Sequence, residues 1–456
     1  MPLSIIILAA GQGTRMKSSR PKVMHRLAGK PMLQHVVDAS AALGPDQIIV
    51  VVGHNSQQVR EHMKDQNLRF IEQHEQLGTG HAVAQCLGEY NEGNDLLVLY
   101  GDVPMVTSET LQRLHRDAGE SAVNILSFMP ENPQGYGRVI RSDNGSIEAI
   151  VEEKDATEEQ KSIRESNSGI MYIQGKQVRQ MIEKLDNRNA QSEFYLTDVV
   201  KHCTAAGLNV TASVCLAEEE VYGVNNQAQL AEAERVYRRR QAEQLMQQGV
   251  KLYDPARIDI RGNLKVGADI EIDINCVFEG DVTLADNVKI GANCVIRNSS
   301  IGANSVIMPM TSIDDAMIGS QVSIGPFARI RPGTECADEV KIGNFVETKK
   351  AQIGKGSKVS HLSYIGDTEM GAEVNIGAGT ITCNYDGVNK FKTIIEDGVF
   401  VGSDTQLIAP VKIARGSVIG AGSTITRDTP ADKLTLSRSK QFTVDAWKKP
   451  GRKNQD

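Results

Sequence analysis

Basic side chains follow a glycine-rich turn close to the start of the chain. The apolar run 3–10 leads into Gly11 and Gly13, and Arg15 and Lys22 come shortly after them. Backbone N–H groups in such a turn can hold phosphate, and two cations beside it suit a triphosphate that loses pyrophosphate. The third glycine of a dinucleotide-binding motif is missing, and no Gly-Lys-Ser/Thr follows. An ordinary tight turn would have the same glycines, so the turn alone leaves both interpretations open.

A carboxylate stands at the end of another apolar run. Asp102 follows the run 96–100 after one glycine. In open α/β sheets, ligands bind at the carboxyl ends of the parallel strands, where this side chain is expected. The alternative is an aspartate that only forms the turn after a strand.

Cations and one histidine occur together in the second half. Arg331, Lys349, Lys350 and His361 lie in the segments RPG, ETKKA and SHLSYIGD, and no other histidine follows His202. Imidazole suits removal of a proton from an amine near neutral pH. Arg331 and Lys349 offer positive charge for a sugar phosphate. The alternative is a polar surface histidine beside a solvated pair of lysines.

A six-residue repeat must position these groups. Aliphatic or aromatic residues recur at this spacing, with one-residue shifts between blocks: Ile272, Phe278, Leu284, Ile290, Ile296; Ile301, Ile307, Ile313; Ile318, Ile324, Ile330; Val401, Leu407, Ile413, Ile419, Ile425. One short strand cannot bury its apolar residue alone, whereas stacked coils bury a continuous column. The repeat predicts a parallel β-helix. It lapses over 382–393, which predicts a loop expelled from one coil, and such loops usually serve binding.

The first half has a different pattern. Continuous apolar runs at 4–10, 48–52 and 96–100 alternate with helical segments at 32–43 and 79–87, as in an α/β sheet covered on both faces. A polar segment over 227–249 predicts one long helix, with Asn225 and Asn226 at its start and Gly249 at its end. We therefore expect domains at 1–227 and 249–456, joined by a linker helix at 228–248.

Composition sets broad limits. The chain has 456 residues, a net charge of −7, 40% apolar and 4% aromatic residues, and seven cysteines without a CxxC pair. The charge argues against chain-wide affinity for nucleic acid or acidic membranes, and the apolar run 3–10 is too short to span a bilayer. The cysteines suggest neither a disulfide framework nor a zinc site, so we expect a cytoplasmic protein.

Resemblance to known families adds roles for individual residues. The stretch LAAGQGTRM followed by PK resembles the signature of sugar-1-phosphate nucleotidyltransferases, which have a Rossmann-like domain. It implies that Arg15 and Lys22 are catalytic, and that Mg²⁺ is held by Asp102 and Asn225, whose oxygens suit this ion. The resemblance also implies contacts to UTP or UDP-N-acetylglucosamine from Leu8, Ala9, Ala10, Gly11, Lys22, Gln73, Gly78, Thr79, Tyr100, Gly101, Asp102, Gly137, Glu152, Asn167 and Asn225.

Taken together, the two halves and the linker resemble one bacterial family of bifunctional uridylyltransferase/acetyltransferases from Leu8 to about Trp447. Its second domain is a left-handed β-helix, with His361 as the implied catalytic base. The implied glucosamine 1-phosphate contacts are Arg331, Lys349, Tyr364, Asn375 and Lys390. Those to acetyl-CoA are Ala378, Asn384, Tyr385, Ser403, Ala421 and Arg438. Departures from the family pattern are mild and include Glu153 and Thr348, beside the sites.

The resemblance implies a two-step enzyme. It acetylates glucosamine 1-phosphate with acetyl-CoA and then couples the product with UTP, giving UDP-N-acetylglucosamine for peptidoglycan and, where present, lipopolysaccharide. It also implies a homotrimer with acetyl-CoA between neighbouring subunits. One alternative is a single-activity nucleotidyltransferase whose β-helix is structural or regulatory; another is a non-enzymatic scaffold. The histidine, the lysine pair and the expelled loop argue against the first alternative, and Asp102 with the glycine turn argues against the second.

Overall fold

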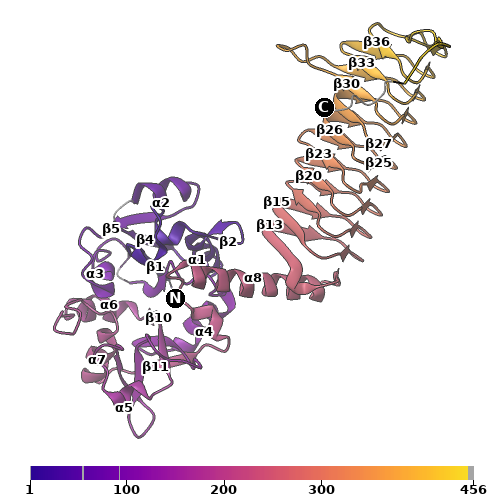
Figure 1. Cartoon of the computed structure of the whole chain (residues 1–456). Helices are drawn as coiled ribbons and strands as arrows, with labels where there is room; N and C mark the ends of the chain where they lie inside the picture. The colour runs from indigo at the N-terminus through magenta and orange to yellow at the C-terminus, as the bar shows by residue number, and fades with distance from the viewer. Residues whose placement is uncertain (1, 54–55, 92, 450–456) are drawn as a thin grey trace, which may run out of the picture. The chain divides into compact units, whose positions relative to one another are not determined.

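The computed structural model describes residues 2–53, 56–91 and 93–449 (Figure 1). The chain divides into two compact units, Met1–Arg240 and Gln241–Asp456, which are taken one at a time below. The basic end of the chain, 450–456, lies outside the described residues. No helix of the described part is long and apolar enough to cross a membrane.

The first unit is built around a mixed sheet with the strand order β11-β7-β10-β6-β1-β4-β5. Its parallel centre consists of β1 (Leu3–Ala9), β4 (Gln47–Val52) and β6 (Asp95–Tyr100), and every residue of β1 is buried. The three apolar runs are therefore strands, as predicted. Beside them lie β5 (Arg69–Glu72), β7 (Val123–Phe128), β10 (Ser166–Ile173) and β11 (Val210–Val214), with β10 antiparallel to β6 and β7.

Helices and a hairpin complete this unit. The predicted helices are α1 (Met32–Ala41) and α3 (Thr79–Ala84), each ending two or three residues before the expected boundary. The other helices are α2 (Ser56–His62), α4 (Ser108–Ala118), α5 (Glu158–Lys161), α6 (Gly175–Ile182) and α7 (Asp198–Ala205). A hairpin of β8 (Arg138–Arg141) and β9 (Ile147–Val151) joins the sheet through β10. The sequence analysis did not predict this hairpin.

The long polar helix is α8 (Gln227–Gln247), and the boundary between the units falls inside it. Its 21 residues give a length of roughly 30 Å at ~1.5 Å per residue. Asn226 caps its start, since Asn226 Oδ1 accepts a hydrogen bond from the Gln229 amide at 2.9 Å. Gly249 follows its end with φ of 91°, a conformation that favours glycine.

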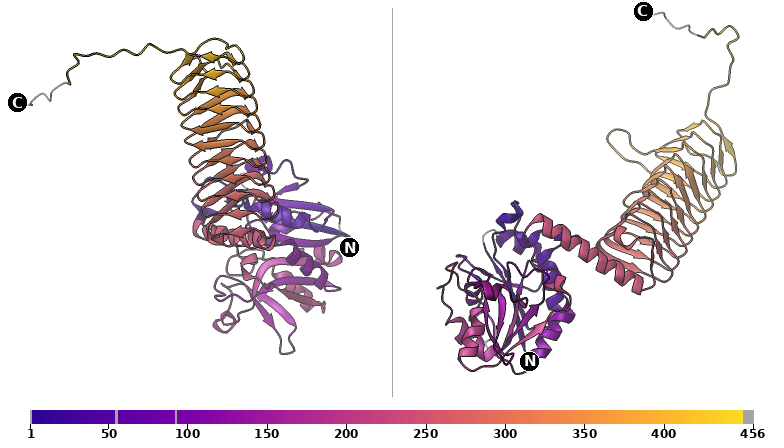
Figure 2. Two further views of the ribbon diagram at one scale, coloured as in Figure 1. Left: turned by 90° about the vertical axis from the view of Figure 1, so that its right-hand side faces the viewer. Right: turned by 60° about the horizontal axis from the view of Figure 1, so that its bottom comes forward.

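The second unit is a parallel β-helix (Figure 2). Short strands pair with strands one coil away, so that Ile272 lies beside Ile290, and Ile290 beside Ile307. All the repeat residues predicted to point inward are buried, with exposures of 0–4%. They belong to one continuous core, so the predicted aliphatic column is confirmed.

Three faces result from this winding. The first runs from β12 (Lys251–Leu252) to β37 (Leu434–Thr435) and includes β25 (Lys341–Asn344), β27 (Lys358–His361), β29 (Asn375–Ile376), β32 (Phe400–Val401) and β35 (Val418–Ile419). The long strands β26 (Glu347–Ile353) and β28 (Tyr364–Met370) belong to the other two faces and extend across the corner between them. The second face continues through β30 (Ile381–Cys383) and β33 (Gln406–Ile408), and the third through β31 (Thr393–Ile395) and β34 (Val411–Ile413).

The predicted expelled loop lies between β30 and β31. Tyr385 and Lys390 form an antiparallel bridge within it, and a loop projects from the stacked coils in the right-hand view of Figure 2. The Asn384 amide contacts the Asp367 carboxylate on the preceding coil. The loop is therefore attached to the β-helix at its base.

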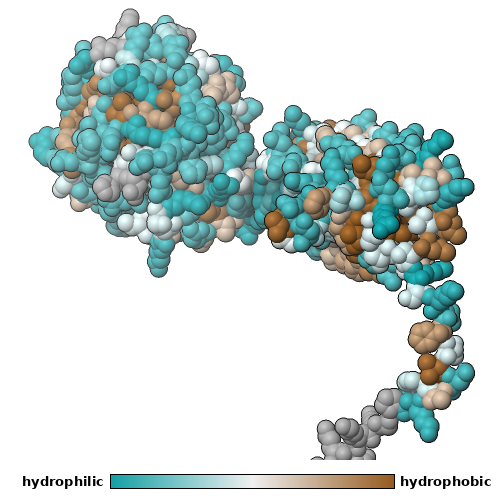
Figure 3. Space-filling model, turned by 90° about the horizontal axis from the view of Figure 1, so that it is seen from above, coloured by the Kyte–Doolittle hydropathy of each residue, from teal (hydrophilic) through white to brown (hydrophobic). Residues whose placement is uncertain are grey.

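The corner after the first face has an unusual composition. Successive coils place left-handed residues there: Asn275, Asn293, Met310, Phe327, Phe345, Leu362, Gly379, Asp404 and Gly422. Asparagine, aspartate and glycine suit a positive φ, whereas the four bulky apolar residues do not. Phe327 and Phe345 stack with ring centroids 5.3 Å apart, and both are about half exposed. Apolar side chains are visible on the surface of this unit in Figure 3.

Candidate active sites

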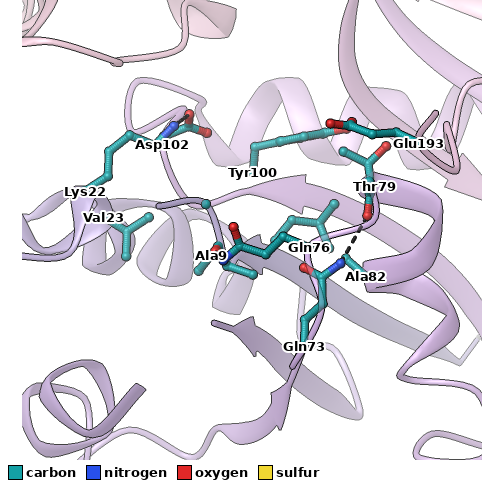
Figure 4. Close-up of a pocket in the computed structure, with 14 residues that line it drawn as sticks. Ala9, Lys22, Val23, Gln73, Gln76, Thr79, Ala82, Tyr100, Asp102 and Glu193 are labelled. Atoms are coloured by element: carbon teal, nitrogen blue, oxygen red, sulfur yellow. Dashed lines mark hydrogen bonds and ion pairs between the residues drawn. The ribbon is translucent and has the colours of Figure 1, made fainter. Parts of the chain in front are cut away.

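A pocket of about 230 Å³ opens at the carboxyl ends of β1 and β6 (Figure 4). Many of the predicted nucleotide contacts line it: Leu8, Ala9, Ala10, Gly11, Lys22, Gln73, Gly78, Thr79, Tyr100 and Asp102. Gly101, between two of them, packs against Val23 at the same edge. The pocket thus lies at the predicted position, at the carboxyl ends of the parallel strands, where open α/β sheets bind ligands.

Charged groups converge on one side of this pocket. The Lys22 ammonium forms an ion pair with Asp102 and donates a hydrogen bond to Asn225 Oδ1 at 3.1 Å. Arg15 Nη2 donates to the same oxygen at 2.9 Å. In Figure 4, Lys22 and Asp102 point toward each other. The structure therefore joins four predicted residues that are up to 210 positions apart.

The Asp102 and Asn225 oxygens fit a divalent cation. Both are hard oxygen donors of the kind that Mg²⁺ prefers. They already share one cation, the Lys22 ammonium, so their oxygens are directed at a common point. The hydrogen bond from the Val224 amide to the Asp102 carbonyl, at 2.8 Å, holds the two segments together.

The predicted sugar-side residues form a second group. The backbone N–H of Asn167 donates to the Gly137 carbonyl at 2.8 Å, and a Cβ added at Gly137 would lie 3.4 Å from Glu152 Oε2. Glu152 Oε1 accepts from the Thr197 hydroxyl at 3.0 Å, and burial raises the pKa of this carboxyl. Asn167 is buried, and its Oδ1 has no hydrogen-bond partner among the described residues. An oxygen of this kind suits a ligand hydroxyl or amide.

Four residues that line the pocket were missed by the sequence analysis: Val23, Gln76, Ala82 and Glu193. Gln76 donates a hydrogen bond from Nε2 to the Ala10 carbonyl at 2.7 Å, which fixes the glycine turn, and Glu193 lines the far side. Gln76 lies three positions after Gln73 in the same segment, which was the available signal. Glu193 belongs to a loop without periodicity, and nothing in its sequence context marked it.

In the second unit, His361 ends β27 with an exposed side chain. Its Nδ1 lies 2.7 Å from Asn344 Oδ1, and the two residues are paired on neighbouring strands. An amide oxygen only accepts hydrogen bonds, so Nδ1 carries a hydrogen, and in the neutral imidazole Nε2 is then the acceptor. Asn344 was missed, although its 17-residue separation from His361 equals one coil.

Three predicted phosphate-binding cations gather at the corner between the second and third faces. Arg331 and Lys349 lie on adjacent coils, because the preceding residues of both pair directly. Lys390, on the expelled loop, contacts Lys349, and its ammonium lowers the pKa of Lys349. Arg331 Nη1 also donates to Glu347 Oε1 at 2.7 Å, a partner that the sequence analysis missed. Adjacent like charges at one corner suit an anion.

The predicted acetyl-CoA contacts occupy another edge. Three of them follow buried residues that pair on successive strands: Ala378 follows Ile376, Ser403 follows Val401 and Ala421 follows Ile419, each by two positions. His361 has the same place one coil earlier, two positions after Val359. Arg438 Nη1 donates to the Ala421 carbonyl at 2.9 Å, so it extends this edge. Asn384 and Tyr385 instead belong to the loop at the other corner.

One chain does not gather all the predicted sugar-phosphate contacts on one face. Tyr364 lies on β28, at the second face, beside the corner with Arg331 and Lys349. Asn375 lies on β29, at the first face. The predicted set is therefore divided between two surfaces of the same β-helix.

Comparisons with known proteins agree with both halves. Residues 5–170 match the model of a MobA-like NTP transferase domain, residues 260–353 a GMPPB C-terminal domain, and residues 392–427 bacterial transferase hexapeptide repeats. A bifunctional protein GlmU from Cupriavidus pinatubonensis is 53% identical over 451 residues, 99% of each chain. The chain belongs to the GlmU family.

Other members of the family are equally similar. One from Marinobacter nauticus is 53% identical, covering 98% of this chain and 99% of the relative, and one from Nitrosospira multiformis is 54% identical, covering 99% and 98%. The chain is an enzyme with uridylyltransferase and acetyltransferase activities. The predicted family, fold class and pair of activities are confirmed, and the single-activity alternative is not favoured.

Proposed function

We propose that the two activities divide between the units. The β-helix transfers acetyl from acetyl-CoA to the amine of glucosamine 1-phosphate, and the first unit couples the product with UTP, releasing pyrophosphate. The convergence of Arg15, Lys22, Asp102 and Asn225 at the pocket supports this assignment most strongly. Residues 1–227 then form the uridylyltransferase domain, 228–248 the linker and 249–456 the acetyltransferase domain.

In uridylyl transfer, a phosphate oxygen of N-acetylglucosamine 1-phosphate attacks the α-phosphorus of UTP and pyrophosphate leaves. Arg15 and Lys22 neutralise the triphosphate and the departing charge. Asp102 and Asn225 would hold Mg²⁺, which supplies charge neutralisation at the phosphates when bound. Lys22 contacts both of these residues, so it can turn from them to the phosphates without leaving the pocket. Gly137, Glu152 and Asn167 hold the sugar.

In acetyl transfer, the substrate amine attacks the thioester carbonyl while His361 Nε2 accepts the proton that the nitrogen loses. The thioester C–S bond then breaks, and the departing CoA sulfur takes up this proton and leaves as the thiol. Asn344 leaves that nitrogen free to accept. Arg331, Lys349 and Lys390 bind the sugar phosphate, with Tyr364 and Asn375. Asn384 and Tyr385 lie beside the acetyl group. Ala378, Ser403, Ala421 and Arg438 contact acetyl-CoA along their shared edge.

We also propose a homotrimer. Hexapeptide repeats are consistent with oligomerisation, and the division of Tyr364 and Asn375 between two faces leaves the sugar-phosphate site incomplete in one chain. A neighbouring β-helix would bring its first face against the second face of this one. The enzyme acts in the cytoplasm, where UTP, acetyl-CoA and reduced cysteines are found; all seven cysteines are free thiols.

The test is a coupled assay. Purified protein receives glucosamine 1-phosphate, acetyl-CoA, UTP and Mg²⁺, and free CoA, pyrophosphate and UDP-N-acetylglucosamine are measured together. Without acetyl-CoA, neither pyrophosphate nor UDP-N-acetylglucosamine should form. Added N-acetylglucosamine 1-phosphate should restore the formation of both. Pyrophosphate release from glucosamine 1-phosphate at the same rate without acetyl-CoA would contradict the proposed order of steps.

A further inference from the structure

Arg138 is a buried cation that the reaction does not use. It begins β8, and its side chain is 2% exposed. Nη1 contacts the Tyr136 carbonyl, and Nη2 donates to the Lys161 carbonyl at 3.4 Å. Nη2 also lies 2.8 Å from Glu153 Oε2. This contact is an ion pair without the alignment of a hydrogen bond. The guanidinium thus links the segment before β8, the end of α5 and the segment after β9.

Charge makes Glu153 the important partner. A guanidinium taken out of water is costly unless an anion accompanies it, and removing one member of a buried pair leaves the other uncompensated. The two carbonyls supply dipoles, whereas Glu153 supplies a full negative charge. The Glu153 side chain is itself 27% exposed, so it is the half of the pair that can be changed without opening the core.

The pair lies directly beside two of the predicted sugar contacts. Gly137 precedes Arg138, and Glu152 precedes Glu153. Arg138 is also the register partner of Val151, so the two strand ends lie side by side. The gap between them is narrow, since a Cβ at Gly137 would approach Ile150 Cγ2 to 3.0 Å and Glu152 Oε2 to 3.4 Å. Any widening of the hairpin would separate the Gly137 backbone from the Glu152 carboxylate.

We propose that the Arg138–Glu153 ion pair is a positioning pair that sets the spacing of Gly137 and Glu152 around the sugar of N-acetylglucosamine 1-phosphate. This inference rests on the proposed function of the first unit. Neither Arg138 nor Glu153 lines the pocket proposed for the nucleotide.

Glu153→Gln tests the proposal, because it keeps the size of the side chain and removes its charge. We expect the KM for N-acetylglucosamine 1-phosphate to rise about fivefold to tenfold, while kcat and the KM for UTP stay within about twofold. Glu153→Asp keeps the charge and should restore most of the affinity. Glu148→Gln is the matched control, since Glu148 is exposed on β9 of the same hairpin.

Acetyl transfer by the same chain reports on the second unit, and a cooperative thermal unfolding transition reports whether the first unit, which contains Glu153, is folded. An unchanged KM for the sugar phosphate in Glu153→Gln would overturn the proposal. So would equal rises in the KM values for UTP and the sugar phosphate, which indicate general loosening. If Glu153→Gln does not fold, Glu153→Ala decides, because it also removes the charge of this partly exposed side chain and should raise the sugar-phosphate KM selectively. Absence of uridylyl transfer in the unmodified protein would refute the proposed function instead.

Discussion

The pocket of the first unit and the corners of the β-helix collect their charges differently. In the pocket, opposite charges already satisfy one another: Lys22 pairs with Asp102, and Asn225 accepts from both Lys22 and Arg15. At the β-helix corner, Arg331 pairs with Glu347, but Lys349 and Lys390 are neighbouring like charges. A set of groups that neutralises itself can persist without substrate, whereas adjacent ammonium groups are stabilised by an added anion.

The two sites also differ in completeness. Loops and strand ends of one unit surround the nucleotide pocket. Its hydrogen-bonded side chains are up to 210 positions apart in the sequence, as Arg15 and Asn225 are. The β-helix instead places side chains only at fixed intervals along its faces, so Asn375 and Tyr364 remain on different faces. A β-helix aligns side chains of successive coils along one edge. It cannot bring side chains on two different faces of the same chain together. We infer that the first site needs one chain and the second needs a neighbour.

The strongest test of this division is Asp102→Ala. We expect uridylyl transfer to fall by about 10³-fold, because the proposed Mg²⁺ site would lose a ligand and Lys22 loses its anionic partner. Acetyl transfer should be unchanged. Asp65→Ala, at an exposed position of the same unit, is the control. Retained uridylyl transfer at ordinary Mg²⁺ would show that another group holds the metal.

His361→Ala probes the other site. The turnover number for acetyl transfer should fall by roughly 10²–10⁴-fold, since a positioned base typically contributes that much, and the KM values should change little. Uridylyl transfer in the same sample is the control. If turnover is unchanged, the base is another group, and Tyr364→Phe would then be the informative variant.

Dilution should separate the activities without any mutation. If the acetyl-transfer site needs a neighbouring chain, its rate per chain should fall about tenfold or more at concentrations well below those that support the trimer. The uridylyl-transfer rate per chain should stay constant. Sedimentation at the same concentrations measures the assembly. A monomer with full acetyl transfer would show that one chain suffices.

The smallest expected effect concerns pH. Burial raises the pKa of Glu152, so this carboxylate takes up a proton at a higher pH than an ordinary glutamate as the pH falls. The KM for N-acetylglucosamine 1-phosphate should therefore rise severalfold on acidification before the KM for UTP changes. Glu152→Gln should bind the sugar more weakly at neutral pH and lose most of this dependence. A pH profile identical in the two proteins would assign the titration to the substrate phosphate.

Periodicity decided which features the sequence could predict. The apolar residues from Ile272 to Ile330 are buried as expected, because a strict interval allows only one inward column. No repeat predicts the contact between Lys22 and Asn225. These residues are 203 positions apart, and only the folding of the segment between them brings them together. Arg138 and Glu153 were also beyond prediction as partners, because neither has a repeat or a motif that specifies its neighbour.

The number of stacked coils sets the length of the second unit along its helix axis. Neighbouring strands are spaced by about 4.8 Å, so each coil raises everything beyond it by that amount. Every coil between β12 and β22 (Ser323–Ile324) repeats the same pairing, and none of them contains a predicted acetyl-transfer residue. Deleting one complete coil there would bring His361 one coil closer to the start of the β-helix. The residues around His361 would stay the same. The elevation of the acetyl-transfer corner is thus set by the number of coils and is independent of its chemistry.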